Sequence, residues 1–271
     1  MPVAENLILI AIQAAYLAGN AIMEVYNGPF DIEFKTDNSP ITIADKKAHL
    51  LISEVLAGTG LPVLSEEGVL IPYEERKNWK QFWMVDPLDG TKEFINRNGD
   101  FTVNIALIDN QVPIFGVIYA PVPRLIYWGS ETGSFRFDVE KSDASNFQYL
   151  SSLENSAERL PCISDSAGFW IVGSRSHFNQ ETESYINELR KTYPELSFVS
   201  RGSSLKFCII AEGSADVYPR FGPTMEWDTA AGHAIANFAG CTMVQSGNGL
   251  PVIYNKSSLL NPFFIATNNK K

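Results

Sequence analysis

The sequence has few residues that could form cross-links or bind soft metals. Only three cysteines occur in 271 residues, Cys162, Cys208 and Cys241, and none belongs to a Cys-x-x-Cys pair. This argues against a disulfide framework or a zinc ribbon, and it is typical of a reducing, cytoplasmic compartment. Only three histidines are present, so zinc is the weaker choice for any metal site. The absence of Gly-x-x-x-x-Gly-Lys-[Ser/Thr] argues against a P-loop nucleotide hydrolase.

Positive charge is also scarce. Lys and Arg number 21 against 31 Asp and Glu, which gives a formal net charge of −10 at pH 7. Such a surface repels phosphate backbones, so we expect no nucleic-acid polymer as a partner. A small phosphorylated substrate is not excluded, because a bound cation can invert the local field.

No apolar run is long enough to predict an integral membrane segment. The most apolar N-terminal stretch, Leu7 to Ala18, follows Glu5 instead of a basic residue and is too short to span a bilayer. Peripheral attachment to the inner face of the cell membrane stays open. The apolar positions recur at steps of three and four, which predicts an amphipathic core helix ending before Gly28-Pro29. They are Leu7, Ile10, Ala14, Leu17, Ala21 and Val25.

The order of patterns predicts an α+β protein. A second helix is expected over 42–57, followed by a block of consecutive strands at 61–64, 82–85, 102–108, 114–119, 125–128 and 134–137. Residues 138–161 are polar and predict a mobile loop or lobe boundary. Strands at 170–173, 198–200 and 216–218 then alternate with helices at 180–193, 205–211 and 229–239. We expect a layered α/β/α/β sandwich, one domain over 1–271 with lobes of about 1–161 and 162–271.

The sequence Asp86-Pro87-Leu88-Asp89-Gly90-Thr91 follows an apolar strand. Pro87 removes a backbone donor, and Asp89-Gly90 is expected to reverse the chain. Two carboxylates on such a turn can converge on one point. The same residues are also good turn formers, so a purely structural role stays open.

Other acids occupy comparable positions. Glu66-Glu67 follow the apolar run 61–64, Asp228 begins an apolar helix, and Asp45 stands three residues after Thr42. Glu67 can simply be solvated, Asp228 can be an N-cap, and Asp45 can belong to a capping box. If these carboxylates cluster, they need a cation, and all-oxygen ligands suit Mg²⁺, Mn²⁺ or Ca²⁺. Hard cations held by a few acids are typical of phosphate-ester hydrolysis.

Three segments together resemble the signatures of the inositol-monophosphatase-like, lithium-sensitive phosphatases. They are Glu66-Glu67, Asp86-Pro87-Leu88-Asp89-Gly90-Thr91 and Trp227-Asp228-Thr229-Ala230-Ala231-Gly232, in the family's order. Within that superfamily the chain is most similar to the CysQ-type 3'(2'),5'-bisphosphate nucleotidases. That similarity rests on residues 90–94, 202–208 and 218–222. Lys92-Glu93-Phe94 stands where inositol monophosphatases typically carry Thr-Asn-Phe, which counts against inositol phosphate as the main substrate.

The resemblance implies a site with two or three Mg²⁺ ions, with Mn²⁺ as an alternative. Glu66, Asp86 and the carbonyl of Leu88 would bind the first ion. Asp86, Asp89 and Asp228 would bind the second. Asp45 and Thr91, together with Glu66, would form the catalytic set that activates water.

The resemblance also implies the substrate contacts. The amides of Gly90 and Thr91 would receive the scissile phosphate, and Asp228 would border the substrate. The nucleotide would be surrounded by His177, Ser203, Lys206 and Arg220. Plainer roles stay open, with Ser203 as a helix cap, Lys206 as a solvated residue and His177 as the end of a loop.

The expected reaction is hydrolysis of the 3'-phosphate of 3'-phosphoadenosine 5'-phosphate to AMP, with 3'-phosphoadenylyl sulfate as a possible second substrate. An inositol or sugar phosphatase is the alternative within the superfamily. A noncatalytic phosphometabolite sensor would lack a ligand or water activator, and none is missing. A two-carboxylate glycosidase needs separated acids, which Asp86 and Asp89 are not. The sequence predicts no oligomeric state.

Overall fold

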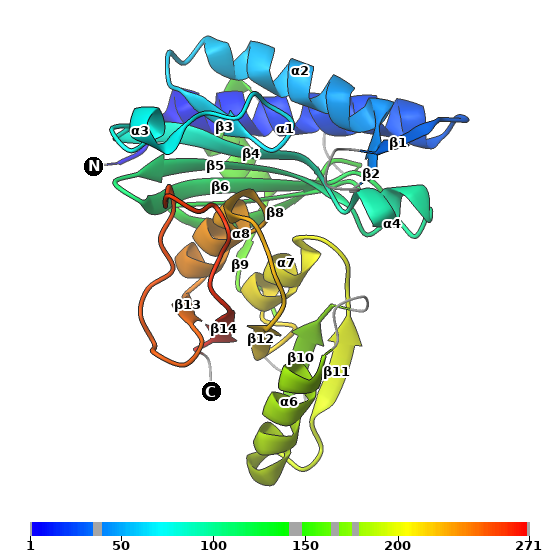
Figure 1. Ribbon diagram of the computed structural model, residues 1–271, viewed down its shortest axis with the longest axis vertical. Helices are drawn as coiled ribbons and strands as arrows, with labels where there is room; N and C mark the ends of the chain where they lie inside the picture. The colour runs from blue at the N-terminus through cyan, green and yellow to red at the C-terminus, as the bar shows by residue number, and fades with distance from the viewer. Residues whose placement is uncertain (1, 35–39, 141–147, 164–167, 175–178, 270–271) are drawn as a thin grey trace.

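The computed structural model describes residues 2–34, 40–140, 148–163, 168–174 and 179–269. The elements stack in layers (Figure 1): a pair of helices, a seven-stranded sheet, a second pair of helices and a five-stranded sheet. This arrangement confirms the expected layered α+β fold. The division into two lobes at about residue 161 remains a prediction.

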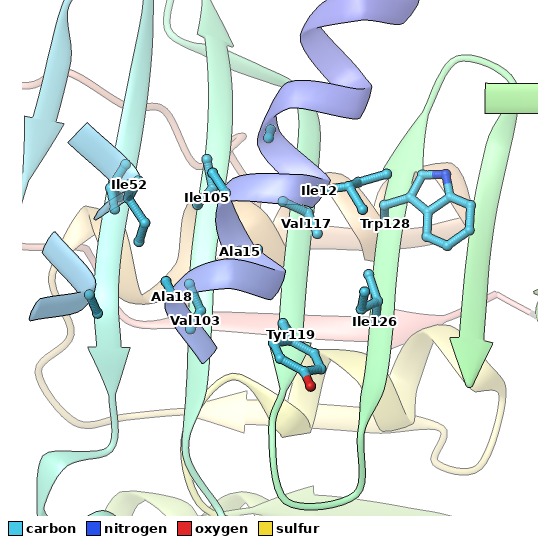
Figure 2. Close-up of a cluster of buried hydrophobic side chains, with 14 of the residues drawn as sticks. Ile12, Ala15, Ala18, Ile52, Val103, Ile105, Val117, Tyr119, Ile126 and Trp128 are labelled. Carbon is cyan, nitrogen blue, oxygen red and sulfur yellow. The ribbon is translucent and has the colours of Figure 1, made fainter. Parts of the chain in front are cut away.

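The outer helical layer consists of α1 (Glu5–Tyr26) and α2 (Ile43–Ala57), which pack side by side. α1 has 22 residues and is apolar enough to cross a membrane by length and composition, so the argument from a short apolar stretch was wrong. Packing gives the better account of its apolar face. Ile12, Ala15 and Ala18 are fully buried against the sheet, as Figure 2 shows. α1 is therefore a core helix of this fold.

The seven-stranded sheet follows chain order from β3 to β9, because most of its strands are joined by short connections. All neighbours are antiparallel except β3 and β4, which are parallel. Its strands are β3 (Val63–Ser65), β4 (Gln81–Asp89), β5 (Thr102–Asp109), β6 (Val112–Ala120), β7 (Leu125–Ser130), β8 (Gly133–Asp138) and β9 (Glu158–Leu160). The central strands are buried along almost their whole length, since helices cover both faces.

The inner helical layer consists of α7 (Leu205–Glu212) and α8 (Glu226–Phe238). α8 lies on the second face of the seven-stranded sheet against β4–β7 and touches β13 on its other side. Gly116 of β6 permits this close approach, because a Cβ there would stand 2.3 Å from the backbone oxygen of Ala231. The sheet therefore fixes the depth at which α8 sits.

The five-stranded sheet has the order β11-β10-β12-β14-β13. Its first three strands are parallel, and β14 pairs antiparallel with both β12 and β13. The bounds are β10 (Trp170–Gly173), β11 (Ser197–Ser200), β12 (Val217–Arg220), β13 (Cys241–Gln245) and β14 (Phe264–Asn268). The amphipathic helix α6 (Gln180–Thr192) packs on this sheet through Ile186, which joins Ile171 and Val217 in a small core.

Several short elements were not predicted. They are β1 (Ile32–Phe34), β2 (Pro40–Thr42), α3 (Tyr73–Arg76), α4 (Thr91–Ile95) and α5 (Leu150–Ser156), besides β9, β13 and β14. The polar segment 138–161 is not simply a loop. Leu150 and Leu153 of α5 are buried, and β9 pairs with β8. Two apolar residues in a polar stretch are too weak a pattern to predict a helix.

Gly116→Ala should push α8 away from the sheet. Overpacking of this kind costs about 1–3 kcal/mol, which urea unfolding would measure. The control is Gly58→Ala, which adds the same methyl group at φ −62° and 3.5 Å from the nearest described atom. Equal midpoints for the two variants would contradict the tight contact between α8 and β6.

Candidate active site

A β-bulge places two carboxylates on the same side of β4. Asp86 pairs with Asn104 and Asp89 pairs with Thr102, so three steps on β4 match two steps on β5. In a regular strand, residues three apart point to opposite faces, and one extra residue corrects this. Pro87 is tolerated because it lies within the bulge. The expected tight turn at Asp86–Gly90 is therefore wrong, since the strand continues to Asp89.

Chain reversal follows immediately after the strand. Gly90 adopts φ +93°, a left-handed conformation that favours glycine, and precedes α4. A Cβ at this position would also lie 3.1 Å from the backbone oxygen of Asp100. Gly90 therefore lets the chain turn between Asp89 and Thr91, which both border the site.

One cleft collects most of the residues that the sequence predicted. Its lining includes Glu66, Asp89, Gly90, Thr91, Ser203, Lys206, Arg220 and Asp228. These residues come from the ends of β3, β4 and β12 and from the first turns of α4, α7 and α8. Asp86 is buried next to them. An oxygen of Asp86 lies within 4.8 Å of oxygens of both Glu66 and Asp228.

Each of the three aspartates at the site accepts hydrogen bonds through one of its two carboxylate oxygens. Asp86 Oδ1 accepts from the N–H of Leu88 at 3.1 Å, and Asp228 Oδ2 accepts from the N–H of Met225 at 2.9 Å. Asp89 Oδ2 accepts from the hydroxyls of Ser203 and Ser204, each at 2.8 Å. Among the described residues, no hydrogen-bond donor reaches the second oxygen of these three carboxylates. Those oxygens remain available to a ligand.

The electrostatics of the cluster are unfavourable without a cation. Burial raises the pKa of Asp86 well above its ordinary value, and repulsion from Glu66, Asp89 and Asp228 raises it further. Burial and the charge of Asp89 likewise raise the pKa of Asp228, against the opposing effect of the Met225 N–H. Glu66, Asp86 and Asp228 could therefore hold a metal ion, and all-oxygen donors of this kind fit a hard divalent cation.

Asp45 forms a second layer behind Thr91. The Thr91 hydroxyl donates to Asp45 Oδ1 at 3.1 Å, and Thr42 donates to Asp45 Oδ2 through both its N–H and its hydroxyl at 2.7 Å. Asp45 thus belongs to a capping box and contacts Thr91 at the same time. Burial raises the pKa of Asp45, while the hydrogen bonds from Thr42 and Thr91 oppose that shift.

The sequence interpretation missed a polar network that joins β5 to the start of α7. Asn104 Nδ2 donates to Ser204 Oγ at 2.9 Å, and Ser204 Oγ lies 2.8 Å from both Asp89 Oδ2 and the backbone oxygen of Asp228. Thr102 Oγ1 contacts Asn104 Oδ1 at 2.9 Å and Ser203 Oγ at 2.5 Å. The polar side chain of Asn104 within the otherwise apolar run 103–108 is the one sequence feature that could have predicted this network.

Two basic side chains border the same cleft. Lys206 is buried and hydrogen-bonds to the carbonyl of Ser203, and desolvation lowers its pKa to about 8 against the opposing effect of Asp89. Arg220 is also buried and donates from Nη2 to the carbonyl of Pro223 at 2.9 Å. Within the described part of the chain, no carboxylate pairs with Arg220 and no acceptor reaches its Nε. Lys206 is not the solvated residue that the alternative reading assumed.

Neither Asp228 nor Ser203 is a helix N-cap. Asp228 is not the N-cap of α8, because Met225 holds that position and Asp228 is the third helical residue. Ser203 is not the N-cap of α7, because Ser204 precedes Leu205. Leu88 offers its carbonyl near Thr91 Oγ1 at 3.4 Å. His177 lies outside the described residues.

Comparisons with known proteins find a family model and several relatives that cover most of the chain. The model of the inositol monophosphatase family matches residues 4–270. The chain is 46% identical over 257 residues to the 3'(2'),5'-bisphosphate nucleotidase CysQ of Shigella flexneri, covering 93% of this chain and 96% of that protein. The protein of the same name from Escherichia coli K12 gives the same identity and coverage.

Two solved structures have the same overall fold as this chain. The crystal structure of CysQ from Bacteroides thetaiotaomicron, a bacterial member of the inositol monophosphatase family, superposes with a TM-score of 0.88 at 48% identity, covering 98% of each chain. The extragenic suppressor protein SuhB from Bartonella henselae has a TM-score of 0.71 at 24% identity, covering 96% of this chain and 93% of that one. This second likeness concerns the fold alone.

Raised aspartate pKa values should make the metal-free protein less stable at high pH. The folded state then binds more protons than the unfolded chain at pH values above the ordinary aspartate pKa of 3.8. The free energy of unfolding therefore falls as the pH rises from about that value through the raised pKa. Asp86→Asn should remove part of this dependence while its Oδ1 still accepts from Leu88.

The measurement is the melting temperature in EDTA between pH 4 and 8. Asp86→Asn should melt above the wild type at pH 8, by about 2–4 °C for each kcal/mol of repulsion relieved, with the gap closing toward pH 4. Asp109→Asn, at the far end of β5, is the control. A variant that melts below the wild type at pH 8 would contradict the repulsion.

Proposed function

The chain belongs to the inositol monophosphatase family, and from this premise we propose that it is a Mg²⁺-dependent phosphatase of nucleoside bisphosphates. The proposed substrate is 3'-phosphoadenosine 5'-phosphate, which would lose its 3'-phosphate to give AMP, and 3'-phosphoadenylyl sulfate is a second candidate. The relatives named above carry the name 3'(2'),5'-bisphosphate nucleotidase, which supports this choice.

The buried cations of the cleft support a substrate with a second phosphate. The cleft combines a cluster of acids with two buried cations, Lys206 and Arg220, and among the described residues no carboxylate lies within ion-pair distance of either. The charges of Asp89 and Asp228 act on them only from further away. Buried charges are costly unless they are paired, so a ligand anion is the natural partner. A nucleoside bisphosphate supplies it, because it carries a second phosphate beside the scissile one. Arg220 can hold that phosphate through parallel hydrogen bonds.

Hydrolysis of the 3'-phosphate requires one bond to form, one bond to break and two proton transfers. The oxygen of water forms a bond to phosphorus, the bond from phosphorus to the 3'-oxygen breaks, and a proton must leave the water while one reaches the departing oxygen. Thr91 Oγ can accept a hydrogen bond from the water, because its own proton is donated to Asp45. The raised pKa of Asp45 favours its transient protonation in this relay. Glu66 borders the same space.

The cations would be held by Glu66, Asp86, Asp89, Asp228 and the carbonyl of Leu88. Bound Mg²⁺ supplies charge that stabilises the attacking and leaving oxygens. The chain's own part is to present one oxygen of each aspartate inward while the other is fixed by N–H or hydroxyl donors. The N–H groups of Gly90 and Thr91 are proposed to receive the scissile phosphate at the start of α4.

The working compartment is proposed to be cytoplasmic. Within the described part of the chain, no disulfide involves Cys162, Cys208 or Cys241. This is the pattern expected where glutathione and thioredoxin keep thiols reduced.

Phosphate release from a panel of substrates tests the function. With MgCl₂, the wild type should hydrolyse 3'-phosphoadenosine 5'-phosphate faster than inositol 1-phosphate or fructose 1,6-bisphosphate. Asp89→Asn should lose at least about 100-fold in kcat while remaining folded, because it removes a charge next to the reacting phosphate. Asp109→Asn should keep full activity. Preferential hydrolysis of inositol 1-phosphate would favour the alternative.

Arg220→Ala separates the nucleotide from simpler substrates. Loss of a charge-assisted contact worth about 1.5–3 kcal/mol should lower kcat/KM for the bisphosphate by roughly 10- to 150-fold, mainly through KM. Activity on a simple monophosphate should change much less. Arg190→Ala on the exposed face of α6 is the matched control. Equal losses on both substrates together with a lower melting temperature would instead assign Arg220 a structural role.

A further inference from the structure

A fully buried carboxylate lies two residues before Asp228. Glu226 is the first residue of α8, is fully buried and is not part of the cleft lining. Its Oε2 accepts from the N–H of Asn255 at 2.5 Å, and its Oε1 accepts from the N–H of Lys256 at 3.1 Å and from Lys256 Nζ at 2.5 Å. Both carboxylate oxygens are therefore committed to the segment around residues 255 and 256.

The same segment is fixed from its other side by α3. Arg76, which is buried, donates from Nη1 to Asn255 Oδ1 at 2.8 Å and to the carbonyl of Lys256 at 2.6 Å. The amide of Asn255 returns a hydrogen bond to the carbonyl of Arg76 at 2.7 Å. Asn255 adopts φ +63°, a left-handed conformation that asparagine tolerates better than most residues. This segment is thus held by specific polar contacts on two sides.

The chain then turns back along the start of α8. The N–H of Glu226 donates to the carbonyl of Leu259 at 2.9 Å, and the N–H of Asn261 donates to the carbonyl of Thr224 at 2.8 Å. The side-chain amide of Asn261 donates to the carbonyl of Met225 at 2.7 Å. Met225 is the residue whose N–H holds Asp228 Oδ2. The contacts of Glu226 therefore continue directly to the residue that orients Asp228.

We propose that Glu226 is a positioning residue for Asp228, acting through the anchor formed by Arg76, Asn255 and Lys256. By fixing the first turn of α8 against residues 255–261, it sets where the Asp228 carboxylate stands relative to Glu66 and Asp86. The inference rests on the proposed function in one respect, that Asp228 is a metal ligand. Glu226 itself does not line the cleft.

A positioning role makes a different prediction from a purely stabilising one. Loss of a residue that orients a ligand weakens metal affinity typically by about 10- to 100-fold. Loss of stability elsewhere lowers the melting temperature and leaves the affinity of the folded protein unchanged. The affinity for Mn²⁺, measured on folded metal-free protein by calorimetry or by electron paramagnetic resonance, distinguishes the two without reference to turnover.

Glu226→Gln is the direct test. An amide has one acceptor oxygen, so one of the two committed positions becomes an NH₂ group that faces a donor. We expect the dissociation constant for Mn²⁺ to rise by about 10- to 100-fold. The control is Ile186→Ala in the small core under α6, which should lower the melting temperature and keep the wild-type dissociation constant.

Lys256→Met is a milder second variant, because this side chain is 24% exposed and its backbone N–H is retained. It should raise the dissociation constant by about two- to fivefold, as expected for a partly exposed ion pair. If Glu226→Gln does not fold, Lys256→Met decides the question. Wild-type Mn²⁺ affinity in a folded variant would overturn the positioning role. A wild type that neither binds Mn²⁺ nor hydrolyses the bisphosphate would instead overturn the proposed function.

Discussion

Repulsion between acids that are crowded into one buried cleft is the constraint around which this structure is arranged. Burial and like charges raise the pKa values of both Asp86 and Asp228. A fold can bring such groups together only if other contacts hold them in place. The protein does this by giving one oxygen of each aspartate to an N–H or hydroxyl donor, from Leu88, from Met225 or from the serines at the start of α7. Oxygens of Glu66, Asp86 and Asp228 lie within 4.8 Å of one another, and a hard cation bound between them would remove the repulsion.

The sequence was informative about elements with strong periodicity. The apolar face of α1, the block of strands from β4 to β8 and the alternation after residue 170 all predicted the layers correctly. Residues 86–90 predict a turn, because Pro and Asp-Gly favour turns in general, whereas β4 continues to Asp89. A bulge in an antiparallel pair has no local sequence signature of comparable strength, since it depends on the register of β5. Helix α5 was not predicted for the same reason. Its few apolar residues are buried by packing against β8 and α1, which the local sequence does not reveal.

The candidate site divides in a similar way. Glu66, Asp89, Thr91, Lys206, Arg220 and Asp228, which the motifs suggested, all line the one cleft. The residues that orient them come from distant parts of the chain and have no motif of their own. Asn104 donates a hydrogen bond to Asp89, which lies 15 positions away in the sequence. Asn261 donates to the carbonyl of Met225 before α8, which lies 36 positions away. Such partners can be found only once the strands and helices are placed, so the sequence alone predicted the candidate ligands but not the residues that orient them. His177 lies outside the described residues, so its role remains a prediction.

Three of the four candidate metal-binding acids come from the seven-stranded sheet, because Asp86 and Asp89 stand on β4 and Glu66 directly follows β3. Lys206 and Arg220 come from α7 and from β12 of the five-stranded sheet, and Asp228 stands on α8. Neutralising a single acid would therefore leave Lys206 and Arg220 in place, together with the carbonyls of Ser203 and Pro223 that accept their hydrogen bonds. Under the proposed function, such a variant would keep the anion-binding side chains and lose hydrolysis, so binding and catalysis could change separately on one scaffold.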